Sequence, residues 1–384
     1  MKHADIYIYF FNKNDIYFMR SIRGKEMAEN GVIIITGSCG RIGAAVVKKL
    51  GEQYRIVGFE LLKALYASRN EELVPVDISS DESVHQAFKH IEYFYGKKIT
   101  AVIHLAAYYS FADQDYSKYD KITVQGTKRL LKALQSFEVE QFIFSSTMLV
   151  HAPCGIHESI NEESPLDPKW AYPCSKVATE NIIHAERGKI PTVNLRIAGV
   201  YDDMCHSIPI SNQIQRIYEK QLTSHFFAGD LSHGASFLHM DDLVDAIDLC
   251  VKKRKDLPQE TTLLLGEAKT LGYNYLQTRI SEILFNKHFK TYSLPKPLAK
   301  IGSFLQNTLP LIPPTFIKPW MIDLADDNYT LDISKAKKLL GWTPKHALDD
   351  TLPIMIAALK KDPLGWYKIN GLKPSSSLLK ELIP

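Results

Sequence analysis

The apolar residues of this chain form short β-branched runs that alternate with longer stretches of helical periodicity. The run at 32–35 leads into a glycine-rich turn and then into a stretch at 44–50 whose apolar and lysine positions suit a helix. Similar apolar runs predict strands at 55–59, 73–78, 100–107, 141–147 and 192–197, and the stretches between them predict helices at 81–95, 116–137 and 172–183. This alternation is typical of βαβ units, so we expect an α/β fold with a doubly wound parallel sheet.

Beyond residue 200 the predicted strands and helices no longer alternate regularly, and we expect a smaller lobe there. Helices are expected at 212–222 and 275–285, and a strand at 226–230. Residues 236–243 return to the strand-to-helix pattern, and a Pro-rich apolar segment spans 294–320. Its part at 309–317 is expected to pack as a loop on the core, with an apolar pocket or a membrane surface as the other interpretations.

The turn between the first strand and the first helix carries three glycines at three-residue spacing. The N-terminus of a helix offers unpaired N–H groups and a positive dipole, and residues without a Cβ let a pyrophosphate approach closely. We therefore expect a dinucleotide here. Its expected contacts are Gly37, Ser38, Cys39, Gly40, Arg41, Ile42 and Gly43.

Glu60 ends the second predicted strand, about 20 residues after the glycine turn. A carboxylate at this position accepts a hydrogen bond from a ribose hydroxyl and repels a 2′-phosphate, so NAD is favoured over NADP. Arg41, in the glycine turn, is the one feature that favours NADP over NAD. Ligands on parallel sheets bind where strands end. The further cofactor contacts expected at these ends are Asp77, Ile78, Leu105, Ala106, Ala107 and Ser145.

Tyr172 and Lys176 open a helix that follows a strand ending in hydroxyl residues. Four-residue spacing places both side chains on one helix face, where an ammonium lowers the pKa of a phenol from about 10 toward neutrality. Tyr172 then becomes a usable general base, and both residues are also expected to contact the cofactor.

Composition excludes some classes of protein. The chain is 45% hydrophobic and 23% charged with a net charge of +3, so a globular fold is expected and nucleic acid is not an indicated partner. Five cysteines without a C-x-x-C pair suit free thiols, and cytoplasm is the expected location. No apolar run reaches membrane-spanning length, and residues 1–30 are expected to be a poorly ordered extension.

Histidine and cysteine residues near the expected site have structural interpretations. His151 and His239 are expected to be hydrogen-bonded structural side chains, and Cys39 and Cys174 small fillers. No spacing of His, Cys and Asp indicates a metal site.

The set of motifs resembles the extended short-chain dehydrogenase/reductase superfamily, and within it the NAD-dependent epimerase/dehydratase group, over residues 31–350. The matching residues are Thr36, Gly37, Gly40, Gly43, Glu60, Asp77, His104, Leu105, Ala106, Ala107, Val124, Gly126, Thr127, Ser145, Ser146, Thr147, Tyr172, Lys176, Phe237, His239, Asp241, Asp242, Leu243, Leu340, Gly341, Trp342 and Pro344. The resemblance implies an NAD-binding Rossmann domain at 31–200 plus 233–265, a substrate lobe at 201–232 plus 266–360 and a homodimer. The tail at 361–384 is expected to be loosely held.

The resemblance also implies that Tyr172 takes a proton from a substrate hydroxyl, that Lys176 holds ribose hydroxyls, and that Thr147 binds the same substrate oxygen. Ser146 is an alternative to Thr147. Dehydratases of the group carry Asp-Glu after the catalytic threonine, where this chain has Met148 and Leu149, so dehydration is not expected.

Two departures bear on the substrate. Gly199 and Ala235 stand where sugar-nucleotide epimerases usually have asparagine and arginine; Arg216, Arg279 or Lys318 are the alternative sources of positive charge. Three functions remain open: an epimerase of a nucleotide sugar, a dehydrogenase or reductase of a more apolar alcohol such as a sterol-like or polyketide-like compound, and a non-catalytic NAD sensor. The intact set of Thr147, Tyr172 and Lys176 argues against a sensor.

Overall fold

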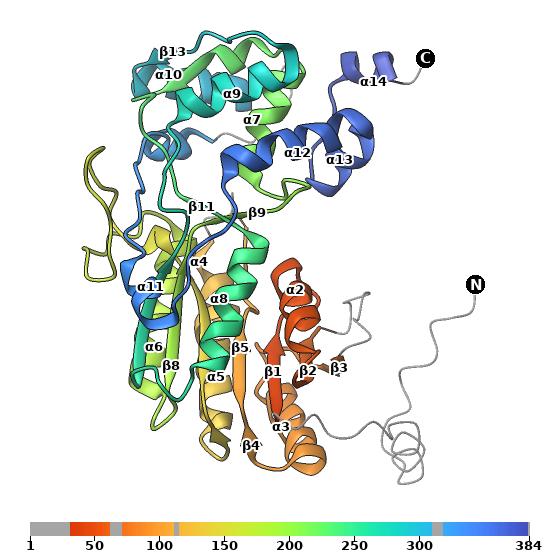
Figure 1. Cartoon of the computed structure of the whole chain (residues 1–384), viewed down its shortest axis with the longest axis vertical. Coiled ribbons are helices and arrows are strands. Elements are labelled where there is room, and N and C mark those ends of the chain that lie inside the picture. Colours follow the sequence, from red (N-terminus) through yellow and green to blue (C-terminus); the bar gives the residue numbers. More distant parts are fainter. Residues whose placement is uncertain (1–30, 62–70, 111–114, 309–317, 383–384) are drawn as a thin grey trace.

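The computed structural model describes residues 31–61, 71–110, 115–308 and 318–382, and a helical lobe lies above a parallel sheet in Figure 1. The expected extension over residues 1–30 and the apolar segment 309–317 lie outside the described residues.

Seven parallel strands form the main sheet in the order β12-β8-β7-β5-β1-β2-β3. They are β1 (Val32–Thr36), β2 (Arg55–Glu60), β3 (Glu71–Pro75), β5 (Ala101–His104), β7 (Phe142–Thr147), β8 (Thr192–Ile197) and β12 (Glu260–Leu265). Strand order changes direction at β1, which pairs with β2 on one side and β5 on the other. The carboxyl end of β1 is therefore the switch point at which such sheets bind ligands.

Helices cover both faces of the sheet, which confirms the doubly wound fold. One face carries α2 (Arg41–Leu50), α8 (Met240–Lys252) and α11 (Ser334–Leu340), and the other carries α3 (Asp81–Tyr95), α5 (Gln125–Leu134) and α6 (Ala171–Glu186). Successive side chains of a strand point to opposite faces, so Ile33 and Ile35 join one core and Ile34 the other. All three are fully buried, and each stabilises the fold by about 1.5–3 kcal/mol.

Shorter elements complete the domain and link it to the lobe. They are β4 (Lys98–Ile99), α4 (Tyr116–Lys118), the π-helix η1 (Tyr119–Val124), β6 (Glu138–Val139), η2 (Met148–Val150), β9 (Gly199–Tyr201) and β11 (Phe237–His239). The long helix expected at 116–137 is thus interrupted by a π-helical segment. The third strand also lies earlier than expected, at Glu71–Pro75, so that Asp77 and Ile78 follow it in the turn toward α3.

The lobe is mainly helical. Its elements are α7 (Ile208–Tyr218), η3 (Leu222–His225), β10 (Phe226–Ala228), α9 (Tyr273–Phe285), β13 (Tyr292–Leu294), α10 (Lys296–Thr308), η4 (Pro319–Leu324), α12 (Leu348–Lys361), α13 (Pro363–Ile369) and α14 (Ser376–Leu382). The helix expected at 212–222 begins earlier because Pro209 lies in its first turn, where the missing N–H has no cost.

Residues 362–382 pack against the lobe, so the expectation of a loosely held tail is wrong for them. Trp366 and Tyr367 of α13 are each 1% exposed and belong to the core that α7, α9 and α12 share. Trp and Tyr side chains bury a large apolar area, and this outweighs the polar residues of the tail, from which a loosely held segment was expected.

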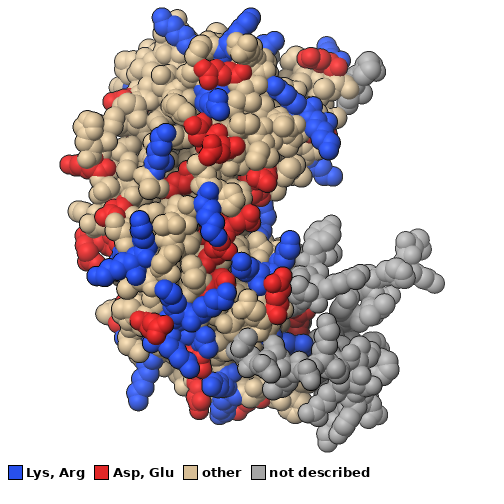
Figure 2. Space-filling view, in the orientation of Figure 1, with Lys and Arg blue, Asp and Glu red and all other residues tan. Residues whose placement is uncertain are grey.

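No helix among residues 31–61, 71–110, 115–308 and 318–382 is long and apolar enough to cross a membrane. On the face shown in Figure 2, positive and negative side chains are interspersed over the sheet domain and the lobe.

Candidate active site

The glycine turn between β1 and α2 is shaped by the absence of side chains. Gly37 has a φ of +73°, and a Cβ on Gly43 would lie 2.1 Å from the carbonyl oxygen of Gly37. Gly40 is the N-cap of α2, and no side chain caps it. The N–H groups of the first helical turn and the helix dipole therefore point toward an open backbone surface, which fits a diphosphate.

Glu60 lies beside this turn at the end of β2. Its carboxylate accepts hydrogen bonds from the N–H of Cys39 (2.9 Å) and of Leu61 (3.1 Å), which fixes it next to the glycines. Burial and the nearby carboxylates of Glu71 and Glu60 raise the pKa of the Cys39 thiol. The two carboxylates therefore both lie near the glycine turn. The arrangement fits a ribose diol and disfavours a 2′-phosphate.

Arg41 does not turn toward Glu60. Its guanidinium donates from Nη1 to the carbonyl oxygen of His206, at the start of the lobe (3.0 Å). Because its charge is directed to another segment, Arg41 favours NADP less than the sequence alone suggested.

The loop after β5 is fixed by a buried histidine. The hydroxyl of Thr36 accepts from the N–H groups of Leu105 (3.2 Å) and Ala106 (3.1 Å), and it contacts His104 Nδ1 at 2.7 Å. His104 Nε2 reaches the hydroxyl of Thr127 at 2.9 Å. Burial lowers the pKa of His104 to about 3, so the ring is neutral near pH 7. Its two hydrogen bonds connect β5, which carries it, to β1 and α5.

The other expected cofactor residues also lie near strand ends. Asp77 caps the turn before α3 by accepting from the N–H of Ser79 (2.8 Å), and Ile78 is buried. Ser145 lies near the end of β7 and its hydroxyl donates to the carbonyl oxygen of His104 (3.2 Å). Parallel strands bring their carboxyl ends to one edge, so these residues share the edge that carries the glycine turn.

Tyr172 and Lys176 lie one turn apart near the start of α6, which begins at Ala171. Lys176 is 3% exposed, its Nζ donates to the carbonyl oxygen of Ser145 (2.6 Å), and the same atom lies 5.7 Å from the ring centroid of Tyr172. The side chain of Thr147 lies close enough to the phenol of Tyr172 to lower its pKa through hydrogen bonding. The structure thus brings together all three residues expected to carry the chemistry.

The expected lowering of the phenol pKa is wrong for this structure. Burial, and next the phenol of Tyr109, raise the pKa of Tyr172 above its ordinary value, although the hydrogen bond with Thr147 lowers it in part. Burial also lowers the pKa of Lys176 to about 7, so much of its ammonium charge is lost near neutral pH. Desolvation is the largest cause of both shifts, and aromatic rings lie against both groups.

Those rings come from the π-helix and from the loop after β5. The ring of Tyr109 lies edge-on to that of Tyr172 at 5.0 Å, and the fully buried Tyr119 lies 6.5 Å away. Tyr119 donates to the carbonyl oxygen of Ser110 at 2.7 Å, which ties η1 to this loop. Tyr109 and Tyr119 were not predicted from the sequence, where the signal was a cluster of tyrosines on both sides of the helix start expected at residue 116.

A buried ionic network lies one helical turn beyond Lys176 on the same stripe of α6, and it was not predicted from the sequence. Arg196 of β8 donates to Glu180 of α6 through Nε (3.2 Å) and Nη2 (2.7 Å), and both side chains are less than 10% exposed. Glu180 accepts in addition from the hydroxyl of Ser146. Because that hydroxyl is committed to Glu180, the geometry favours Thr147 over Ser146 as the group beside the phenol.

His151 belongs to the same network and has the structural role expected of it. Its Nδ1 lies 3.0 Å from the carbonyl oxygen of Ser164 and its Nε2 lies 3.0 Å from Nη1 of Arg196. Burial and the Arg196 charge lower the pKa of His151, which fits a neutral ring that donates from one nitrogen and accepts at the other.

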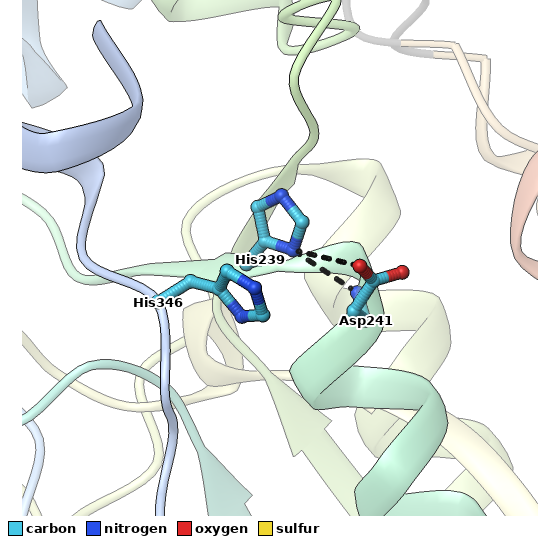
Figure 3. A group of neighbouring side chains, drawn as sticks. All are labelled: His239, Asp241 and His346. Atoms are coloured by element: carbon cyan, nitrogen blue, oxygen red, sulfur yellow. Dashed lines mark hydrogen bonds and ion pairs between the residues drawn. The ribbon is translucent and has the colours of Figure 1, made fainter. Parts of the chain in front are cut away.

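His239, Asp241 and His346 form a compact group at the junction with the lobe, drawn in Figure 3. His239 Nδ1 accepts from the N–H of Asp241 (3.2 Å) and so caps α8. The rings of His239 and His346 are stacked, 4.1 Å between centroids and 21° between planes. Lone pairs in near-parallel ring planes do not converge on one ion, and one of them is already used, so this geometry fits a helix cap better than a metal centre.

Comparison with known proteins places this fold in a family. A sequence model of the NAD dependent epimerase/dehydratase family matches residues 33–266. The chain belongs to this family. The family is NAD-dependent, and the glycine turn and Glu60 fit that cofactor.

Individual relatives differ in activity. UDP-glucuronate 4-epimerase of Thermodesulfobacterium geofontis is 27% identical over 363 residues, 88% of this chain and 97% of that protein. dTDP-D-glucose 4,6-dehydratase of Dictyostelium discoideum is 25% identical over 271 residues, which are 63% of this chain but only 57% of that protein. 3 beta-hydroxysteroid dehydrogenase type 7 of Mus musculus is 23% identical and covers 83% of this chain and 93% of that protein.

Among solved structures, UDP-glucuronic acid 4-epimerase from Bacillus cereus, crystallised with UDP-glucuronic acid and NAD, matches with a TM-score of 0.65 and 20% identity. The match covers 86% of this chain and 99% of that one. At this identity the likeness shows the fold.

Proposed function

We propose that this protein is an NAD-dependent epimerase that transiently oxidises a hydroxyl-bearing carbon of a nucleotide sugar. The observation that carries the proposal is the arrangement of Thr147, Tyr172 and Lys176 at the carboxyl edge of the sheet, beside the glycine turn. The epimerase relatives that match this chain over nearly their whole length support the substrate class.

In the proposed reaction, Tyr172 takes the proton of the substrate hydroxyl and returns it after the carbon has been reduced from its other face. Thr147 hydrogen-bonds the same substrate oxygen and keeps it next to the phenol. Lys176 stabilises the phenolate whenever its ammonium is charged, and it holds the end of β7 through the carbonyl of Ser145. NAD, when bound, is the hydride acceptor for the oxidation and the hydride donor for the reduction.

The surroundings of Thr147 bear on the choice between epimerisation and dehydration. Elimination of water needs an additional acid and base next to the reacting carbon. The two residues that follow Thr147 are Met148, which is 3% exposed, and Leu149, and neither carries an ionisable group. We therefore propose epimerisation in preference to dehydration, although dehydratases occur among the relatives.

Of the three cations considered for a nucleotide, Arg216 suits the task best. Arg279 is paired with Asp349 at 3.1 Å, and Lys318 is the N-cap of η4. Arg216 donates from Nη2 to the hydroxyl of Tyr273 at 3.2 Å, and the ring of Tyr273 is stacked on that of Phe227 with 3.9 Å between centroids. Among the described residues no ion pair of Arg216 is found, so its charge remains available for a phosphate.

The proposal is tested by purifying the protein, measuring bound nicotinamide by its absorbance, and supplying UDP-glucose and UDP-glucuronate. Retained NAD and an epimerised sugar without net NADH support it. Net NADH from a sterol-like alcohol would instead establish the dehydrogenase, an activity also found among the relatives. No turnover of any alcohol together with NAD binding would favour the sensor.

Tyr172→Phe tests the proposed base directly. We expect kcat to fall roughly 10²–10⁴-fold, because general base catalysis is lost, while NAD binding is kept. Tyr93→Phe is the matched control, since Tyr93 is 71% exposed on α3. Wild-type turnover by Tyr172→Phe would remove the phenol from the mechanism. The homodimer and the cytoplasmic location stay predictions from the sequence.

A further inference from the structure

The loop 202–206, between β9 and α7, has an unusual backbone. Cys205 and His206 both have positive φ values, +81° and +43°, which residues with a Cβ rarely adopt. Such conformations persist only where surrounding contacts enforce them, and they concentrate at functional segments. The contacts that hold this loop therefore show what it is built to do.

Contacts within the loop close it on itself. Asp202 and Cys205 exchange backbone hydrogen bonds at 3.2 and 2.8 Å. The Asp202 carboxylate accepts from the N–H of Met204 (2.9 Å) and lies 2.5 Å from Nδ1 of His206. These bonds make the loop a compact unit that moves as one piece.

Two segments far away in the sequence fasten this unit. Asn370, at the end of α13, accepts from the N–H of His206 (2.8 Å) and donates to the carbonyl oxygen of Met204 (3.0 Å). On the other side, Arg41 donates to the carbonyl oxygen of His206 (3.0 Å), and its charge contributes to lowering the pKa of Asp202. The loop thus links the C-terminal part of the lobe to the first turn of α2.

The loop makes a further contact with His239. Nε2 of His239 is buried without a hydrogen-bond partner and lies 3.5 Å from the carboxylate of Asp203, whose side chain is 62% exposed. This is a weaker attachment than the bond from Arg41, because the distance exceeds that of a hydrogen bond.

We propose that Arg41 is a positioning residue that holds the loop 202–206 against the diphosphate end of the NAD site and thereby slows NAD release. Arg41 belongs to the helix turn whose open N–H groups fit the diphosphate. Movement of the lobe away from this turn requires the bond between Arg41 and His206 to break. The inference rests on NAD as the family's cofactor and on no particular reaction.

Slow release matters because an enzyme that oxidises and re-reduces one substrate must keep the same cofactor molecule. A net dehydrogenase must instead exchange it in every cycle. The hydrogen bond from Arg41 to the loop 202–206 therefore favours retention of NAD.

The experiment loads the full-length protein with NADH, adds excess NAD, and follows the loss of bound NADH fluorescence by stopped flow. We expect Arg41→Ala and Asn370→Ala each to speed release about tenfold, as for loss of a strong hydrogen bond. The double variant should be little faster than either single variant, because both act through the same loop. Arg41→Lys should restore part of the retention. Lys48→Ala, an exposed lysine on the same helix, is the control for lost charge and should release NADH at the wild-type rate.

Fast release by Arg41→Ala with a wild-type rate for Asn370→Ala would overturn the proposal, since Arg41 would then act on the cofactor itself. Wild-type rates for both variants would overturn it as well. Asp202→Asn, which weakens the loop from within, replaces Asn370→Ala if that variant does not fold and should likewise speed release. The rates require no turnover, so they are independent of the proposed epimerase reaction.

Discussion

Raising the pH from 7.5 to 8.5 should stabilise the folded protein, stripped of NAD, through Lys176. Burial lowers the pKa of this lysine from 10.5 to about 7 in the folded chain, whereas the unfolded chain keeps the ordinary value. Across this window the unfolded chain binds more protons at this site than the folded chain does. The free energy of unfolding therefore rises with pH, and this contribution is lost as the pH falls toward 7.

The magnitude follows from the two pKa values. The folded lysine is mostly neutral above pH 7.5 and the unfolded one is fully charged, so nearly one proton separates the states. At 1.36 kcal/mol per proton and pH unit, integration from pH 7.5 to 8.5 gives about 1.2 kcal/mol. The side chain is 3% exposed, so solvent screening does not reduce this value substantially.

The assay is urea unfolding at both pH values for the wild type and for Lys176→Met, which keeps the length of the side chain without its proton. The free energy of unfolding of the wild type should increase by about 1.2 kcal/mol more than that of the variant. Subtraction of the variant removes the contributions of the cysteines and histidines. Lys48→Met is the matched control and should keep the wild-type increase. Equal increases in the wild type and Lys176→Met would refute a buried, largely neutral lysine.

Three further substitutions test other parts of the structure. Glu180→Gln leaves Arg196 buried without its counter-charge and should lower the free energy of unfolding by about 3 kcal/mol; a loss under 1 kcal/mol in urea unfolding would contradict a buried pair. Trp366→Ala should cost about 3–5 kcal/mol because the indole is 1% exposed, and wild-type stability would mean that α13 is not part of the lobe core. Glu60→Gln should reduce the preference for NAD over NADP about tenfold in binding titrations, and an unchanged ratio would show that Glu60 does not face the ribose.

The sheet was predictable because its strands are short apolar runs separated by turn signals. The glycine turn and α3 were predictable for the same local reason: Gly37 and the Ser80 cap act on neighbouring residues. The helices of the lobe were harder to place, since the start of α7 depends on Pro209 and the anchoring of α13 on burial of Trp366.

At the site, the residues were predictable but their electrostatics were not. The spacing of Tyr172 and Lys176 fixes them on one helix face, yet the direction of their pKa shifts depends on how completely they are buried. The rings that pack against Tyr172 are those of Tyr109 and Tyr119, which lie far away in the sequence. The pair of Glu180 and Arg196 was missed for the same reason, because it joins a helix to a neighbouring strand.

Apart from Phe237 of β11, the core of the lobe draws on two separate stretches of the chain, before and after the segment that forms β11, α8 and β12. Tyr201 and Ile214 come from the first stretch, and Leu276, Leu352 and Trp366 from the second. An engineer who wishes to transplant substrate recognition from another member of the family must therefore exchange both stretches together. A chimera that exchanges only one stretch would pack core side chains from two different proteins against each other, without the complementary shapes that a dense core needs.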